Sequence, residues 1–131
     1  MLRSDIDARE DELFEQFERL ERVDCIACCH ACHRACLDLA AALERGYGVE
    51  AIRFGTLLLD CAEINRALAS SLTDFTTRLN RPLAMLCAEL GERCGAECAR
   101  CVDEDDGETC IGACARSIHA CRRLAELETL Q

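Results

Sequence analysis

Thirteen cysteines in a chain of 131 residues are the side chains with the most chemical potential in this sequence. Thiolates are soft ligands that select Cu(I), Zn(II) and iron–sulfur clusters, and thiols can also form disulfides or take part in redox reactions. The number of cysteines is odd, and the first 22 residues contain no apolar run typical of a signal peptide. In a reducing cytosol thiols stay free, so we expect metal or redox chemistry and not a disulfide framework.

The spacing of the first cysteines places them on one face of an α-helix. Four of them follow the pattern C-x3-C-x2-C-x3-C, at Cys25, Cys29, Cys32 and Cys36. At 100° per residue their side chains fall within about 60° of arc. Cys28 lies on the flank of this face, and Leu39 and Leu43 continue it. We therefore predict that the thiols line the side of the helix that packs against its neighbours.

The same spacing recurs twice more. One copy reads Cys87, Gly91, Cys94 and Cys98, extended by Cys101, and the other reads Cys110, Cys114, Ser117 and Cys121. The remaining thiol lies on an otherwise apolar stripe, made of Leu57, Cys61, Ile64, Leu68, Leu72 and Phe75. Three helices therefore supply twelve of the thirteen thiols, and the pattern is that of a repeated unit.

A core filled with side chains as small as cysteine is poorly packed unless something occupies the space between them. One buried cysteine is an ordinary small hydrophobic residue, but thirteen would leave voids that cost stability. A row of thiolate-bridged metal ions fills such space. We expect all thirteen cysteines to be metal ligands, with His33 and Met85 as candidate accessory ligands.

Copper(I) is the metal that this pattern favours. Zinc prefers four ligands in separate tetrahedral sites, whereas a continuous stripe of thiols suits an ion that accepts two or three sulfurs. Zn(II) remains the alternative. The iron–sulfur spacing that ends in Cys-Pro is absent, because the only proline is Pro82.

The helices that must position these thiols can be delimited from capping and breaking residues. We predict helices over about 5–22, 24–45, 49–75, 80–101 and 108–127, with Asp24 and Asn80 as caps and a loop in the acidic run 102–107. No alternating strand pattern occurs. The expected fold is all-α, a single domain over 1–131: an antiparallel four-helix bundle over 24–128, with an additional amphipathic helix over 5–22 that lies across it or mediates self-association.

Composition narrows the class of partner. The formal charge of −10, from 15 basic and 25 acidic residues, disfavours nucleic acid and anionic membrane surfaces. No run of eighteen apolar residues occurs, so we expect no membrane span and a cytoplasmic protein. No Ser-His-Asp set, phosphate loop or HExxH motif is present, and we do not expect an enzyme. A homo-oligomer is expected.

The segments CIACCHACHRAC, CAELGERCGAECARC and CIGACARSIHAC resemble those of the cysteine-rich four-helix-bundle copper-binding family, which includes bacterial copper storage proteins. The similarity extends from about Cys25 to Leu124. It implies a bundle whose lumen takes up many Cu(I) ions, commonly as an oligomer. The chain departs from the family pattern at Asn65, Gly91 and Ile118, where further thiols are expected.

Two other functions remain open from sequence. A redox or electrophile sensor would use exposed thiols with low pKa values beside arginines, and Arg34, Arg100 and Arg122 flank the cysteines. A structural or interaction bundle would use cysteine as core filler and would bind no metal.

Overall fold

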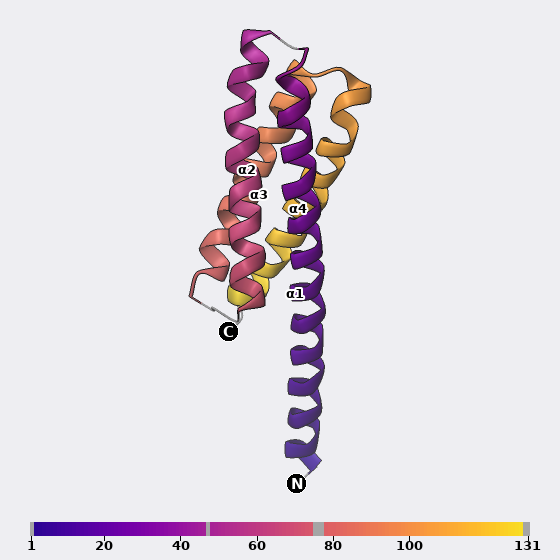
Figure 1. Ribbon diagram of the computed structural model, residues 1–131. Helices are drawn as coiled ribbons and strands as arrows, with labels where there is room; N and C mark the ends of the chain where they lie inside the picture. The colour runs from indigo at the N-terminus through magenta and orange to yellow at the C-terminus, as the bar shows by residue number, and fades with distance from the viewer. Residues whose placement is uncertain (1, 47, 75–77, 130–131) are drawn as a thin grey trace.

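The chain forms four antiparallel α-helices, as Figure 1 shows. The computed structural model describes residues 2–46, 48–74 and 78–129. The helices are α1 (Leu2–Leu43), α2 (Val49–Thr73), α3 (Asn80–Cys101) and α4 (Glu104–Thr129). Short connections place consecutive helices side by side in opposite directions. The predicted all-α, antiparallel four-helix bundle is confirmed.

The four helices pack as a ring around a central lumen. Among the described residues, α1 and α3 each pack against both α2 and α4, whereas the diagonal pairs α1–α3 and α2–α4 do not approach each other closely. Only side chains reach the centre of such a ring. The residues at the central positions of each helix therefore determine what fills the lumen.

The first helix is longer than predicted and has no break. We predicted a separate helix over 5–22 and a cap at Asp24, and this boundary is wrong, because α1 runs through Asp24 without interruption for 42 residues. No glycine or proline occurs between Leu2 and Leu43 to stop it. The Asp24 carboxylate lies 4.0 Å from the thiol of Cys28, one turn further along the same helix. At 1.5 Å per residue α1 is about 63 Å long.

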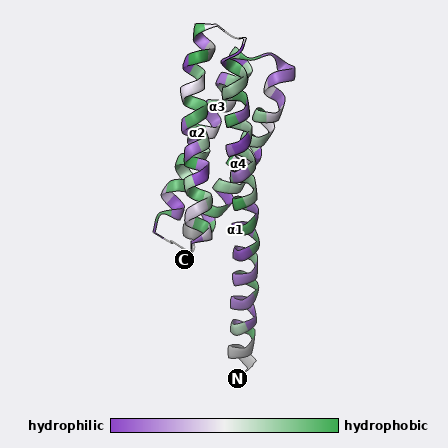
Figure 2. Cartoon of the chain, in the orientation of Figure 1, coloured by the Kyte–Doolittle hydropathy of each residue, from purple (hydrophilic) through white to green (hydrophobic). Residues whose placement is uncertain are grey.

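The N-terminal half of α1 projects beyond the bundle, as Figures 1 and 2 show. Leu13, Phe17 and Leu20 on this segment are exposed. The helix meets the bundle near the buried Glu21, whose Oε1 lies 2.6 Å from Nη2 of Arg123 on α4. The guanidinium of Arg123 also lies 6.0 Å from the centre of the Phe17 ring. These contacts hold the projecting helix to the end of α4.

Two other boundaries differ from the sequence-based expectation. Asn80 is not a cap but the first residue of α3, where it is buried and its Oδ1 accepts a hydrogen bond of 2.7 Å from Ser71 Oγ. Pro82 lies in the first turn of α3, where it costs no helical hydrogen bond. The acidic run is only partly a loop, because α4 begins at Glu104 and not at about 108. Acidic side chains in a first turn are stabilised by the helix dipole. The expected end of the second bundle helix at Phe75 lies outside the described residues.

Candidate metal centre

The cysteines form the central core of the bundle. Eleven are buried and two, Cys28 and Cys101, are half-buried, and none is in a disulfide. The buried ones are Cys25, Cys29, Cys32, Cys36, Cys61, Cys87, Cys94, Cys98, Cys110, Cys114 and Cys121. The three predicted stripes therefore face the lumen, and the predicted position of Cys28 on a flank agrees with its partial exposure.

Neighbouring turns of α1 bring its sulfurs together in pairs. The Sγ atoms of Cys25 and Cys29 lie 4.0 Å apart, as do those of Cys32 and Cys36. This is the separation that two thiols four residues apart adopt on one helical face.

Contacts between α1 and α4 join two of the three cysteine stripes. Cys25 lies 3.9 Å from Cys121, measured between sulfurs. Cys32 lies 3.8 Å from Cys114, and Cys36 lies 3.9 Å from Cys110. These three contacts follow one another along the bundle because α1 and α4 are antiparallel, so residue numbers rise on α1 where they fall on α4.

Three sets of sulfurs are close enough to share metal ions. Within each set all sulfurs lie within 4.8 Å of one another. The sets are Cys32, Cys36, Cys61 and Cys114; Cys36, Cys94, Cys110 and Cys114; and Cys25, Cys29 and Cys121. The first two sets share Cys36 and Cys114. Shared sulfurs suit bridging thiolates in a cluster better than separate tetrahedral sites.

Two further buried thiols lie beside these sets. The thiol of Cys87 donates to the Ile64 carbonyl oxygen at 3.4 Å, and that of Cys98 to the Gly107 carbonyl oxygen at 3.7 Å. A Cβ atom added at Gly107 would lie 3.0 Å from the Cys98 sulfur. Gly107 therefore allows α4 to begin close against this thiol.

The half-buried thiols have acidic neighbours. Cys28 Sγ lies 4.0 Å from Asp24 Oδ1, and Cys101 Sγ lies 3.6 Å from Glu97 Oε2. Burial raises the pKa of both thiols. A raised pKa disfavours the thiolate that a redox sensor would use.

The candidate accessory ligands lie outside the sulfur sets. Nδ1 of His33 is 2.8 Å from the Ala62 carbonyl oxygen. Because a carbonyl can only accept, Nδ1 carries the proton and the lone pair of Nε2 stays available. Met85 is 52% exposed on α3, so it does not pack in the core. It lies about 160° around α3 from Cys87.

The buried thiols hydrogen-bond to one another, which shifts their pKa values in both directions. Hydrogen bonds from Cys25, and then from Cys29 and Cys87, lower the pKa of Cys121. The same contact with Cys121, together with burial, raises the pKa of Cys25 and of Cys87. A thiolate formed at Cys121 is thus stabilised by neighbours that keep their protons.

The larger set of thiols behaves in the same way. Hydrogen bonds, the largest from Cys114, lower the pKa of Cys61 and of Cys110. Contact with Cys110 raises the pKa of Cys36, and burial raises it further. The raised pKa values favour the protonated form of Cys25, Cys36 and Cys87 in the metal-free chain, so a metal ion that binds to these thiols displaces protons.

Three of the four helices, α2, α3 and α4, present no sulfur to the middle of the lumen. Asn65 on α2 is fully buried, and its Nδ2 donates to the Cys61 carbonyl oxygen at 2.8 Å. Its Oδ1 accepts a hydrogen bond of 2.7 Å from Ser117 on α4. On α3 the same level is occupied by Gly91, where an added Cβ would lie 2.8 Å from Cγ1 of Ile118. The spacing of the cysteines predicts these positions as departures from the thiol pattern, but it does not predict their contacts.

Comparison with known proteins gives one consistent result. The family model for copper storage protein matches residues 11–126. Comparison with the curated proteins gives no match. A solved structure of a cytosolic copper storage protein from Streptomyces lividans, loaded with five coppers, has 26% sequence identity and a TM-score of 0.76, over 85% of this chain and 97% of that one.

Two other solved structures are similar. A histidine-to-alanine variant of the Streptomyces lividans protein Ccsp has 27% sequence identity and a TM-score of 0.76, over 84% of this chain and 96% of that one. A protein from Nitrosospira multiformis has 26% identity and a TM-score of 0.72, over 83% of this chain and 98% of that one.

Proposed function

The chain belongs to the copper storage protein family, and from this membership we propose that its lumen stores several Cu(I) ions on cysteine thiolates. The observation that carries the proposal is the pair of four-sulfur sets that share Cys36 and Cys114. An ion bonded to two sulfurs at about 2.3 Å, the length of a zinc–thiolate bond, brings those sulfurs within about 4.6 Å of each other. All sulfurs within each set lie within 4.8 Å of one another, a limit close to this value.

Copper(I) fits the sets better than zinc. Zinc would use one set of four and leave the other incomplete, because two of the sulfurs are shared. The third set offers only Cys25, Cys29 and Cys121, a number that suits the low coordination of Cu(I). Zn(II) is the alternative cargo, which direct competition between the two metals decides.

Storage is favoured over catalysis by the enclosure of the thiols. Eleven of them are buried in the lumen, where a substrate larger than a metal ion has no access. The charge of bound Cu(I) offsets the charge of the thiolates, whose number in one apolar core would otherwise be prohibitive. We propose no enzymatic activity.

The cellular location and the absence of membrane and nucleic-acid partners are inferred from the similar protein, the hydropathy of α1 and the net charge. A cytoplasmic location is supported by the cytosolic relative. Within α1, the segment Ile6–Leu43 has an 18-residue window of mean hydropathy 1.2, long and apolar enough to span a membrane by those two criteria. The thiols of this helix face the bundle lumen, so we assign it to the core. The net charge of −10 supports the absence of a nucleic-acid partner.

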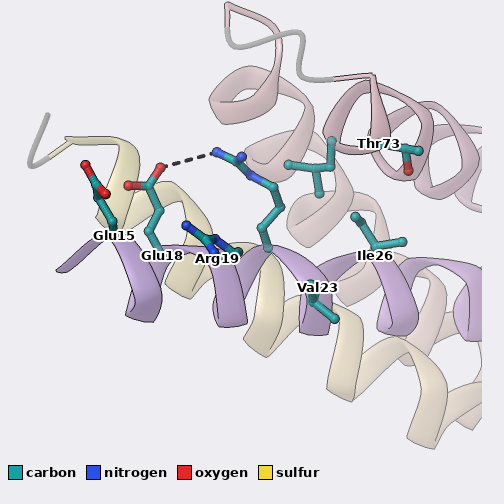
Figure 3. Close-up of a pocket in the computed structure, with 8 residues that line it drawn as sticks. Glu15, Glu18, Arg19, Val23, Ile26 and Thr73 are labelled. Carbon is teal, nitrogen blue, oxygen red and sulfur yellow. Dashed lines mark hydrogen bonds and ion pairs between the residues drawn. The ribbon is translucent and has the colours of Figure 1, made fainter. Parts of the chain in front are cut away.

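A homo-oligomer is the proposed assembly. Where α1 leaves the bundle beside the end of α2, a surface groove of about 660 Å³ is lined by Val23, Ile26 and Leu72 (Figure 3). The ion pair between Glu18 and Arg22, 3.3 Å long, borders it. With the exposed Phe17 and Leu20 nearby, this segment offers an apolar surface to a second copy. Light scattering of the wild type and of Leu20→Glu tests this: a monomeric wild type would contradict it.

Anaerobic titration of the fully reduced chain with Cu(I), against a chromophoric chelator, tests the storage function. We expect tight uptake of on the order of ten ions per chain, near one per buried thiol, and a rise in thermal stability. Changing Cys36 and Cys114 together to serine should lower the capacity strongly, while the Cys101→Ser control lowers it little. Saturation at two ions or fewer, or fast reversible disulfide formation under mild peroxide in its place, would overturn the proposal.

A further inference from the structure

The lumen contains two separate groups of thiols. The larger, called compartment I, consists of Cys32, Cys36, Cys61, Cys94, Cys98, Cys110 and Cys114. The smaller, called compartment II, consists of Cys25, Cys29, Cys87 and Cys121. Compartment I lies at the end of the bundle where α3 meets α4, and compartment II at the end where α1 projects.

Sulfur contacts stay within each compartment. Across the described residues, every hydrogen bond between two thiols joins members of one compartment, and each of the three sets able to hold a metal ion also lies within one compartment. The helix that comes nearest to bridging them is α1, where Cys29 and Cys32 are three residues apart, but in the part of the chain that the structure describes no hydrogen bond joins these two thiols. Neither the hydrogen bonds between thiols nor the sets able to hold a metal ion therefore join the two compartments.

The side chains of Asn65 and Ser117 lie between the two compartments and present oxygen and nitrogen atoms there instead of sulfur. Their side chains are 0% and 1% exposed, and the hydrogen bond of 2.7 Å between them spans the lumen from α2 to α4. The Asn65 amide also donates to the Cys61 carbonyl oxygen at 2.8 Å, so its orientation is held from both ends. Amide and hydroxyl oxygens are poor ligands for Cu(I), which prefers sulfur.

At the level of Asn65 and Ser117, apolar atoms of Gly91 and Ile118 fill the rest of the lumen. The Ile118 side chain occupies the space beside Gly91, since a Cβ there would lie 2.8 Å from its Cγ1 and 3.3 Å from its Cδ1. At this level α2, α3 and α4 thus present no sulfur, although each has a cysteine one turn above or below.

Each compartment also has its own half-buried thiol. Cys101 packs against compartment I, and Cys28 packs against compartment II. These two thiols come from different helices, α3 and α1, and Cys28 lies beside Arg116 and His119 of α4. A separate half-buried thiol is therefore available to receive copper for each compartment.

We infer that the layer of Asn65, Gly91, Ser117 and Ile118 divides the store into two compartments that fill with Cu(I) independently. This inference rests on the proposed storage function. Its consequence is two classes of stored copper in one chain, the larger on the seven thiols of compartment I and the smaller on the four of compartment II.

Paired variants test the independence. Cys36→Ser with Cys114→Ser removes the sulfurs shared within compartment I, and Cys25→Ser with Cys121→Ser removes two from compartment II. In chelator competition and native mass spectrometry, each pair should remove copper from its own compartment only. The copper that remains should keep its competition midpoint within about twofold, because the sites share no ligands. A shift of tenfold or more in that midpoint would overturn the inference.

A single added thiol tests the layer itself. Ser117→Cys completes the spacing of α4 and places a sulfur next to Cys121, whose Sγ lies 3.8 Å from the present Ser117 Oγ. We expect the two loading steps to merge into one. The control is Ser71→Cys, because Ser71 is also buried and also donates a hydrogen bond of 2.7 Å to a buried asparagine, Asn80, but is six residues further along α2 than Asn65. It should leave two steps, and the melting temperature of each variant establishes that it folds.

The possible results distinguish copper storage from the division of the store into two compartments. Uptake of two ions or fewer by the wild-type chain would contradict storage and partition together. Uptake of many ions in one step, unchanged by Ser117→Cys, would contradict the partition alone. Loss of the two-step pattern in Ser71→Cys as well as in Ser117→Cys would also contradict it, since the layer would not be responsible.

Discussion

Replacing Gly91 by alanine should destabilise the bundle, whereas the same change one turn later on α3 should stabilise it. At Gly91 the new Cβ would lie 2.8 Å from Cγ1 of Ile118, a distance that forces the isoleucine or the helix to move. At Gly95 nothing lies within 4 Å of the new atom. Both residues are inside α3, so the two substitutions differ only in what the added methyl group meets.

The magnitudes follow from two opposing effects. Alanine is favoured over glycine inside a helix by about 0.8–1.0 kcal/mol. Overpacking a core costs about 1–3 kcal/mol. Gly95→Ala should therefore raise the unfolding free energy by roughly 0.5–1 kcal/mol, and Gly91→Ala should lower it by up to about 2 kcal/mol. At about 4 °C per kcal/mol the two melting temperatures should differ by roughly 4–12 °C.

Urea denaturation of the reduced, metal-free chain, followed by circular dichroism, measures both values. Ile118→Ala should remove the clash, so the cost of Gly91→Ala should be smaller in that background, as contacting residues are not additive. If Gly91→Ala stabilised the chain as much as Gly95→Ala does, the close fit of Gly91 against Ile118 would be refuted. The layer of Asn65, Gly91, Ser117 and Ile118 would then lack its close apolar contact.

Three further predictions concern the ion pair at the end of α4, the protons of the lumen and the exposed thiols. Arg123→Ala should cost about 1 kcal/mol in urea denaturation because it leaves the buried Glu21 carboxylate unpaired, while Arg66→Ala, which removes an exposed pair with Glu63, should have no measurable effect. The folded metal-free chain holds the protons of thiols with raised pKa values, such as Cys36 and Cys94, more tightly than the unfolded chain does. Below pH 9 these thiols contribute in full to the free energy of unfolding. Above pH 9 this contribution falls by about 1.4 kcal/mol per pH unit for each thiol. A free energy of unfolding that stays constant from pH 9 to 10 would contradict protonation of these buried thiols. Alkylation of the native metal-free chain, mapped by mass spectrometry, should modify Cys28 and Cys101 before the eleven buried thiols, and equal rates at all sites would contradict their burial.

The positions of the thiols could be predicted because they depend on one helix at a time. Residues spaced three and four apart share a face whatever the helix packs against, so Cys25, Cys29, Cys32 and Cys36 had to line one side of α1. The apolar residues that follow them identified that side as the inner one. The same arithmetic places Met85 opposite the thiol stripe of α3, where the structure has it exposed.

Contacts between helices could not be obtained in this way. The hydrogen bond between Asn65 and Ser117 joins residues 52 positions apart, and the spacing on each helix shows only that both lie on a central stripe. Helix ends were uncertain for a different reason. Asp24 is common both as a cap and inside a helix, and acidic residues such as Glu104 favour both loops and first turns, so only packing decides between them.

Diffraction from crystals of the copper-loaded chain, with data on both sides of the copper absorption edge, locates the stored metal. We predict anomalous peaks inside the lumen, bonded to sulfurs of the eleven buried cysteines, with Cys36 and Cys114 each bound to more than one ion. Copper found only on the outer surface, for example between Cys28 and His119, with an empty lumen, would contradict storage in the bundle core.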